Sequence, residues 1–134
     1  MYRFDITLYR GAQIRVNRGM YYHHGIYIGD NTVIHFASNT PGYETDPNFA
    51  EVCETTLEGF LKGGALEVRE YSNEELKDKR DNQAIIDYAK SAIGRKGYNL
   101  ITNNCEHFSN ECAFGKAYSS QVDSIRDLIS SLFR

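Results

Sequence analysis

The segment from Met20 to Ala37 constrains the fold most strongly. Residues 20–29 (MYYHHGIYIG) are dominated by aromatic and β-branched side chains, which favour a β-strand. Residues 29–32 (GDNT) are typical of a turn, and residues 33–37 (VIHFA) predict a returning strand. This hairpin carries three of the four histidines of the chain. It therefore predicts both a β-sheet and a concentration of imidazole groups in one place.

Other short runs alternate polar and apolar side chains, as strands with one buried face do. They predict further strands at residues 1–10 (an edge strand), 13–17 and 65–71. Helical spacing of apolar residues, together with capping signals, predicts helices at 56–61, 72–80, 81–93, 105–115 and 120–133. A loop is expected at residues 38–52, which hold both prolines.

Length and composition limit the class of protein. The 134 residues fit a single domain, residues 1–134, and 41% of them are hydrophobic. A net charge of -3 without any run of Lys or Arg argues against a nucleic-acid partner. No stretch approaches the ~18 consecutive apolar residues of a membrane span. Since the N-terminus also lacks the apolar segment of a signal peptide, we expect a cytoplasmic protein without a transmembrane anchor.

The three cysteines, Cys53, Cys105 and Cys112, are odd in number and form no C-x-x-C pair. This pattern favours neither a disulfide framework nor a structural zinc site, and it fits a reducing compartment. We expect no cofactor and no metal. Zinc bound by His23, His35 and Cys105 is a weaker alternative, because the chain has no compact ligand pair such as H-x-x-x-H.

The segment Thr102–Phe108 (TNNCEHF) has the features of a helix start. Asn103 suits the N-cap position, and Glu106 three residues later suits the partner that bonds back to it. Cys105 then lies in the first turn, where unpaired N–H groups and the helix dipole favour a negative charge. We therefore expect its thiol to ionise readily and to act as a nucleophile, with a buried, inert cysteine as the alternative.

A cysteine nucleophile needs a base for its proton and a third group to orient that base. His23 and His35, on the two strands of the hairpin, are the candidates. They face each other directly if the turn is centred on Gly29, which requires a loop with an odd number of residues. A two-residue turn at Asp30 and Asn31 would put the two rings on opposite faces. The catalytic hypothesis therefore predicts the odd loop.

Neighbouring residues are assigned other roles. Tyr21 shares strand parity with His23, so its phenol is a candidate donor to an oxyanion, beside the backbone N–H of Cys105. A stacked core aromatic is the alternative for Tyr21. His24 points to the face opposite His23, and we expect it to be structural. His107 is expected to pack or to cap the helix.

Three segments form a distinctive set: residues 23–30 (HHGIYIGD), 33–37 (VIHFA) and 104–108 (NCEHF). A weaker tail follows, made by Gly115, a serine at 119 or 120, Gln121 and Val122. This set resembles the lecithin:retinol acyltransferase-like family, which includes the HRAS-like suppressor phospholipase/acyltransferases. The family's motifs read H-x-(G/A)-I-Y-(L/V)-G-D, V-x-H-x-A, N-C-E-H-F and G-x-x-x-S-x-Q-V.

The resemblance implies an α+β domain with a circularly permuted papain-like fold, a small antiparallel sheet packed against helices. It implies that Cys105 is the nucleophile, His23 the general base and His35 the residue that orients the base. It also implies an acyl-thioester on Cys105, formed from a phospholipid ester, whose acyl group passes to water, an amine or another lipid.

The expected partner is therefore a lipid or an acylated small molecule, with peripheral contact to a membrane. Two alternatives stay open. One is a cysteine peptidase or amidase that uses the same Cys-His-His triad. The other is a non-catalytic interaction module that retains the fold.

Overall fold

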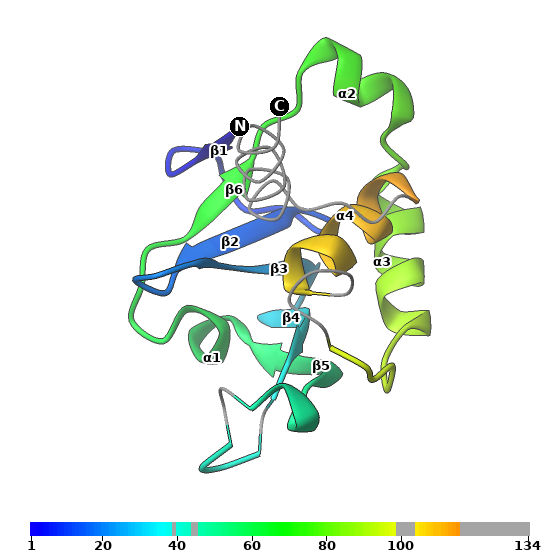
Figure 1. Ribbon diagram of the computed structural model, residues 1–134. Coiled ribbons are helices and arrows are strands. Elements are labelled where there is room, and N and C mark those ends of the chain that lie inside the picture. The colour runs from blue at the N-terminus through cyan, green and yellow to red at the C-terminus, as the bar shows by residue number, and fades with distance from the viewer. Residues whose placement is uncertain (39, 44–45, 99–103, 116–134) are drawn as a thin grey trace, which may run out of the picture.

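The computed structural model describes residues 1–38, 40–43, 46–98 and 104–115. Within them, six strands form one antiparallel sheet in the order β1-β6-β2-β3-β4-β5 (Figure 1). The strands are β1 (Tyr2–Arg3), β2 (Gln13–Asn17), β3 (Tyr22–Gly29), β4 (Thr32–Ala37), β5 (Glu51–Thr56) and β6 (Glu67–Arg69). An antiparallel sheet packed against helices confirms the predicted α+β class.

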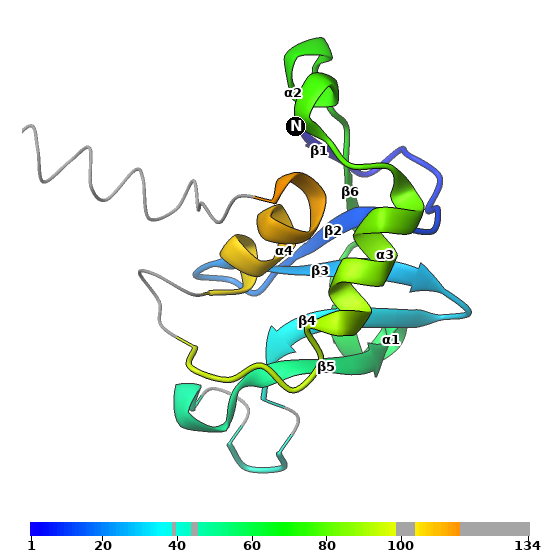
Figure 2. The same ribbon diagram turned by 90° about the vertical axis from the view of Figure 1, so that its right-hand side faces the viewer.

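Helices cover both faces of this sheet. The described helices are α1 (Leu57–Leu61), α2 (Asn73–Asp78), α3 (Asn82–Ser91) and α4 (Cys105–Phe114), with a 3₁₀ helix at Pro47–Phe49, and α1, α3 and α4 are the ones that lie on the faces. Figure 2 shows α3 and α4 on one face and α1 on the other. Successive side chains of a strand point to opposite faces, so β3 and β4 supply residues to both layers.

Two apolar clusters fill these layers. On the α3/α4 face, buried residues of the strands pack against both helices: Ile26, Ile34, Phe36, Val52, Ile85, Ala89, Phe108 and Cys112. On the α1 face, Phe60 is the centre of a second cluster with Ile14, Val16, Val33 and Val68. The sheet is therefore buried on both sides where the hairpin lies.

A buried polar network also fixes α4 to the sheet. Gln13 donates through Nε2 to Ser109 Oγ at 2.8 Å and to Asn110 Oδ1 at 3.1 Å. Arg69 donates to the same Asn110 oxygen at 2.7 Å, and the hydroxyl of Tyr71 donates to Gln13 Oε1 at 2.7 Å. Because paired polar groups are directional and unpaired ones are costly when buried, this network specifies one position of the helix.

The turn of the β3–β4 hairpin differs from the prediction. Asp30 and Asn31 form a two-residue turn, with φ of 50° and 58°. Positive φ at both positions is what a type I′ turn requires, and Asn and Asp tolerate it well. The odd loop centred on Gly29 was wrong.

A β-bulge restores the parity that this turn would otherwise break. The register shifts between positions 27 and 29, so Ile28 is an extra residue in β3. Beyond the bulge, Gly25 pairs with His35. His23 and His35 therefore lie on the same face of the sheet, as diagonal neighbours rather than direct partners.

Most of the predicted elements are present, with shifted ends. The strands predicted at 1–10 and 65–71 shrink to the short β1 and β6. The helix predicted at 72–80 is α2, and its Ser72–Glu75 capping box is formed. The helix predicted at 81–93 is α3, capped by Asp81. The helix predicted at 120–133 lies outside the described residues, and none of the described helices is long and apolar enough to cross a bilayer.

Strand β5 is the element that the sequence analysis missed. Its first residues were assigned to the loop at 38–52, yet it pairs with β4 along its whole length, from Thr32–Thr56 to Ala37–Glu51. Only Val52 is fully buried among its side chains. An edge strand with one apolar position has too little alternation to be recognised, and its pairing with β4 is what defines it.

Gly25 permits a close approach between α1 and the sheet. A Cβ at this position would lie 2.7 Å from Cε1 of Phe60 and 2.8 Å from Cγ1 of Val33. The ring of Phe60 therefore occupies the space above Gly25, beside both His23 and His35. The small residue in β3 allows α1 to cover the histidine pair.

We expect Gly25→Ala to lower the free energy of unfolding by about 1–3 kcal/mol, because the added methyl group overpacks the α1 layer. Urea denaturation followed by circular dichroism measures the loss. Gly25→Ala/Phe60→Leu is the matched double variant, since the shorter side chain vacates part of the space. A double variant at least as unstable as the sum of the two single losses would contradict this account of the contact.

Candidate active site

Two buried imidazoles form a hydrogen-bonded pair on the α1 face. Nε2 of His23 lies 2.8 Å from Nδ1 of His35. The ring planes are inclined at 65°, with centroids 5.0 Å apart. Phe60 lies over both rings, with its centroid 5.1 Å from that of His23 and 6.0 Å from that of His35. The hairpin thus brings together the two histidines that the sequence singled out.

Cys105 is the first residue of α4, as predicted, but the helix cap differs. Asn104 is the N-cap: its side chain accepts from the backbone N–H of His107 at 2.9 Å. In return, Nδ1 of His107 accepts from the Asn104 N–H at 3.2 Å. The assignment of the cap to Asn103, which itself lies outside the described residues, was therefore wrong, while the capping role of His107 is confirmed.

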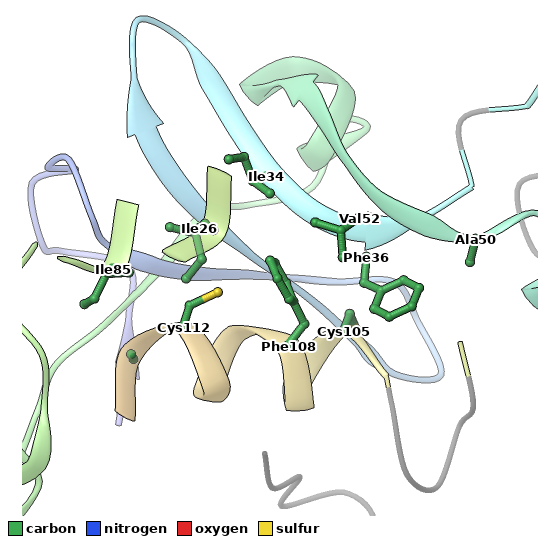
Figure 3. Packing of buried hydrophobic residues seen from close by; sticks show 11 residues of the cluster. Ile26, Ile34, Phe36, Ala50, Val52, Ile85, Cys105, Phe108 and Cys112 are labelled. Atoms are coloured by element: carbon green, nitrogen blue, oxygen red, sulfur yellow. The ribbon is translucent and has the colours of Figure 1, made fainter. Parts of the chain in front are cut away.

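The thiol of Cys105 lies against the start of β3. Its Sγ is 3.9 Å from the carbonyl oxygen of Tyr22, the residue that precedes His23. Cys105 is 4% exposed and belongs to the apolar cluster with Phe36 and Phe108 (Figure 3). The hydrogen bond of the thiol thus goes to the backbone beside His23, rather than to an imidazole ring.

Burial dominates the protonation of this thiol. It raises the pKa of Cys105 to about 11, and the negative charge of Glu106 raises it further in the same direction. Backbone N–H groups of His24, Glu106 and Cys105 itself oppose this rise. The expected readily ionised thiol was therefore wrong for this conformation, because desolvation outweighs the helix N-terminus.

The imidazole of His23 is also uncharged near neutral pH. Burial lowers its pKa well below the ordinary range, and the cations Arg18 and Lys62, together with His35, lower it further. A neutral imidazole is able to accept a proton. The site therefore combines a neutral thiol with a neutral imidazole, rather than a thiolate with an imidazolium.

Two further side chains lie close to the sulfur. Tyr98, half-buried, makes an edge contact with Phe36 at 5.1 Å. Burial raises the pKa of Tyr98, and so do the charge of Cys105 and a side-chain hydrogen bond with it. Arg18 interacts electrostatically with Cys105 and Tyr21, although burial is the main cause of its lowered pKa. Tyr21, 47% exposed, thus stands at the rim of the same group.

Comparison with known proteins gives this geometry a family. Residues 7–118 match the family described as Lecithin retinol acyltransferase. The chain belongs to this family. The matched range contains the hairpin, the start of α4 and all of the candidate residues.

Individual relatives support the assignment to the lecithin retinol acyltransferase family. Human phospholipase A and acyltransferase 4 is 34% identical over 125 residues, which cover 87% of this chain and 76% of the relative. Human phospholipase A and acyltransferase 3 is 33% identical, over 89% of this chain and 76% of the relative. Rat lecithin retinol acyltransferase is 27% identical over 93% of this chain, but the match spans only 62% of the rat protein.

The remaining sequence candidates of this family member take other positions. His24 lies on the α4 face, away from His23, as predicted, and Cys112 is buried in the α3/α4 layer. Cys53 is half-buried in β5, and its thiol contacts the carbonyl oxygen of Ala37 at 3.6 Å. In the described part of the chain, no group of three or more His, Cys, Asp or Glu side chains is arranged to hold a metal ion.

Sequence reasoning missed Tyr98 and Arg18. Neither residue stands in a recognisable motif, because Tyr98 belongs to the segment between two helices and Arg18 to a turn. Arg18 donates to the carbonyl oxygens of Phe60 and Leu61 at 2.7 and 3.2 Å. These contacts show that Arg18 also joins the β2–β3 turn to the end of α1.

We expect alkylation of Cys105 by iodoacetamide to be slow near pH 7 and to accelerate with pH, since the thiolate reacts and the pKa of Cys105 is about 11. Peptide mass spectrometry after timed labelling measures the rate at each pH, with Cys105→Ala as the blank. Cys53 is the internal comparison, because burial also raises its pKa to about 11. A labelling rate for Cys105 that is already constant above pH ~7 would contradict the neutral thiol.

Proposed function

We propose that this protein is a cysteine-dependent acyltransferase or phospholipase A-type hydrolase that acts on lipid esters. The observation that carries this proposal is the 2.8 Å contact between His23 and His35, together with the contact of the Cys105 sulfur with Tyr22, the residue before His23. The proposal is supported by relatives named phospholipase A and acyltransferase or lecithin retinol acyltransferase, whose alignments cover most of this chain. The roles below are assigned on that basis.

His23 is the general base in this proposal, and His35 orients it. We assign the shared proton to Nε2 of His23, which donates to Nδ1 of His35. Nδ1 of His23 then carries a lone pair and accepts the thiol proton. As the ring becomes an imidazolium, His35 keeps accepting from Nε2–H and so stabilises the charge.

The reaction begins when the Cys105 thiol turns from the Tyr22 carbonyl oxygen toward His23. The proton passes to Nδ1 of His23 while the sulfur attacks the ester carbonyl carbon. The tetrahedral intermediate then expels the alcohol of the lipid, which takes the proton from His23. An acyl-thioester remains on Cys105, and water or an acceptor alcohol or amine, deprotonated by His23, releases the acyl group.

The intermediate needs donors for its oxyanion. The N–H of Cys105 belongs to the first turn of α4, where backbone N–H groups have no partner within the helix. A phenol is the natural second donor, and both Tyr21 and Tyr98 lie in the electrostatic surroundings of the sulfur. The structure thus supports two candidates where the sequence suggested Tyr21 alone.

A lipid substrate fits the apolar rim of the site. Met20 is 99% exposed and Tyr21 is 47% exposed, both in the turn that leads into β3. Exposed apolar side chains beside a reactive group favour contact with acyl chains at a membrane surface. We therefore include peripheral membrane contact in the proposal, and the three free cysteines support a cytoplasmic location.

Two alternatives use the same residues. A cysteine peptidase or amidase would keep the roles of Cys105, His23 and His35 and would differ only in the acyl donor. A non-catalytic module would keep the fold, and the burial of Cys105 is the observation that favours it. Incubation with a phospholipid, followed by the intact mass of the protein, distinguishes the lipid acyltransferase or hydrolase, the peptidase or amidase, and the non-catalytic module.

We expect incubation with a diacyl phospholipid to add one acyl group to the protein, seen in the intact mass as one fatty acid minus one water. Hydroxylamine should remove the adduct, because thioesters react with it. Cys105→Ala should fold and gain no adduct, while Cys53→Ala should be labelled like the wild type. Cleavage of a peptide library without an adduct would favour the peptidase, and neither reaction would favour the module.

We expect His23→Ala to lower the acylation rate by about 10²–10⁴-fold, the usual contribution of a positioned general base. His35→Gln should lose less than His35→Ala, since the amide oxygen can still accept from His23. Fatty-acid release from mixed micelles measures both effects, with thermal melting as the control for folding. Wild-type turnover by His23→Ala would remove His23 from the mechanism.

A further inference from the structure

A second buried polar group lies on the face of β3 opposite the histidine pair. Nε2 of His24 is 3.9 Å from Oε2 of Glu106, and both side chains are less than a tenth exposed. The hydroxyl of Tyr2, on β1, lies 3.4 Å from Nδ1 of His24. None of these three residues takes part in the proposed reaction.

His24 touches the site in two ways. Its backbone N–H is one of the groups that act on the Cys105 sulfur, next to the Tyr22 carbonyl that the thiol contacts. Its side chain reaches Glu106, the residue that follows Cys105 in the first turn of α4. One residue of β3 therefore meets both of the first two residues of the helix.

We propose that His24 and Glu106 are positioning residues for Cys105, whose contact holds the first turn of α4 on the backbone of β3. The geometry favours this role because Asn104 and His107 satisfy the cap within the helix itself and leave Glu106 to face the sheet. A shift of α4 along β3 would break the His24–Glu106 contact and move the sulfur away from residues 22–24 at the same time.

The tautomer of His24 suits this contact. Burial lowers the pKa of His24 to about 4 in spite of the neighbouring Glu106 charge, so the ring is neutral near pH 7. A Tyr2 hydroxyl that donates to Nδ1 leaves the ring proton on Nε2, directed at the Glu106 carboxylate. Arg15 supports the arrangement from β2, since its guanidinium lies 4.5 Å from the centre of the Tyr2 ring.

The charge of Glu106 adds a second effect on the nucleophile. It raises the pKa of Cys105, and so opposes ionisation of the thiol in the resting protein. Among the described residues, Tyr98 from the preceding segment and Arg18 from the β2–β3 turn also interact electrostatically with Cys105, and Tyr21 interacts with both of them. From β3, the backbone of His24 acts on the sulfur. Glu106 is therefore the carboxylate through which this positioning contact adds to the rise that burial causes in the pKa of Cys105.

The first test replaces Glu106 by glutamine in the full chain and follows iodoacetamide labelling of Cys105 from about pH 8 to about pH 12, so that the profile extends beyond the wild-type pKa of about 11. The amide keeps an acceptor for His24 but removes the charge, so the midpoint of the rate profile should fall by about one pH unit. Glu111→Gln is the matched control on the same helix, because Glu111 lies six residues beyond Cys105 along α4, pairs with Arg95 and acts on Cys112.

The control should leave the Cys105 midpoint within about 0.2 pH unit of the wild type. A Glu106→Gln midpoint that is equally unmoved would overturn the electrostatic part of the proposal. Alkylation requires no turnover, so this result is independent of the acylation chemistry on which the positioning role rests. If the wild type forms no acyl adduct but the midpoint still moves, the proposed function fails and the influence of Glu106 on Cys105 stands.

The second test concerns position. His24→Leu removes the polar contact and should slow acylation of Cys105 by at least about tenfold, since small displacements of a nucleophile are costly. His24→Gln, whose amide still donates to Glu106, should recover most of the rate. Equal rates for the two variants, with melting temperatures that match, would show that His24 has no positioning role. If His24→Leu does not fold, the Glu106→Gln profile and the His24→Gln rate decide.

Discussion

A single extra residue in β3 determines which face of the sheet the two histidines of the hairpin occupy. The two-residue turn at Asp30 and Asn31 is well suited to its sequence, yet in a regular hairpin it would send the two histidines to opposite faces of the sheet. The bulge at Ile28 shifts the register by one residue and brings His23 and His35 to the same face. The hydrogen bond between their rings, and the cover that Phe60 gives them, both depend on that shift.

Burial determines the protonation states of Cys105 and His23. The first turn of a helix favours an anion by a modest amount, whereas removing a thiolate from water costs more, and the pKa of Cys105 rises accordingly. The same burial lowers the pKa of His23. With a neutral thiol and a neutral imidazole, the proposed reaction transfers the proton as the sulfur attacks the substrate. Such a site needs no thiolate at rest, and a buried Cys105 is protected from oxidants that attack thiolates.

Short sequence patterns predicted the elements that depend on neighbouring residues alone. The hairpin, the capping box of α2, α3 and the placement of Cys105 at the start of α4 could all be read from residue type and spacing. The bulge could not be, because nothing in the composition of β3 marks Ile28 as unpaired. Strand β5 could not be predicted either, because its pairing with β4 is what defines it. Tyr98 interacts with Cys105 through tertiary packing, which no local pattern indicates. The prediction that the Cys105 thiol ionises readily was wrong for a related reason. The burial that raises its pKa results from the packing of the whole fold.

Successive side chains of β3 point to opposite faces of the sheet, so this strand contributes residues to both layers. His23 points to the α1 face, where the proposed base meets His35, and the next residue, His24, points to the α4 face, where it meets Glu106. The backbone between them is what the Cys105 sulfur contacts. Because the pleat fixes the side chains of adjacent residues relative to each other, a displacement of β3 moves the proposed base and the backbone that contacts the Cys105 sulfur together. The position of the Cys105 sulfur relative to His23 then depends on where the first turn of α4 lies. The contact between Glu106 and His24 is made in that turn.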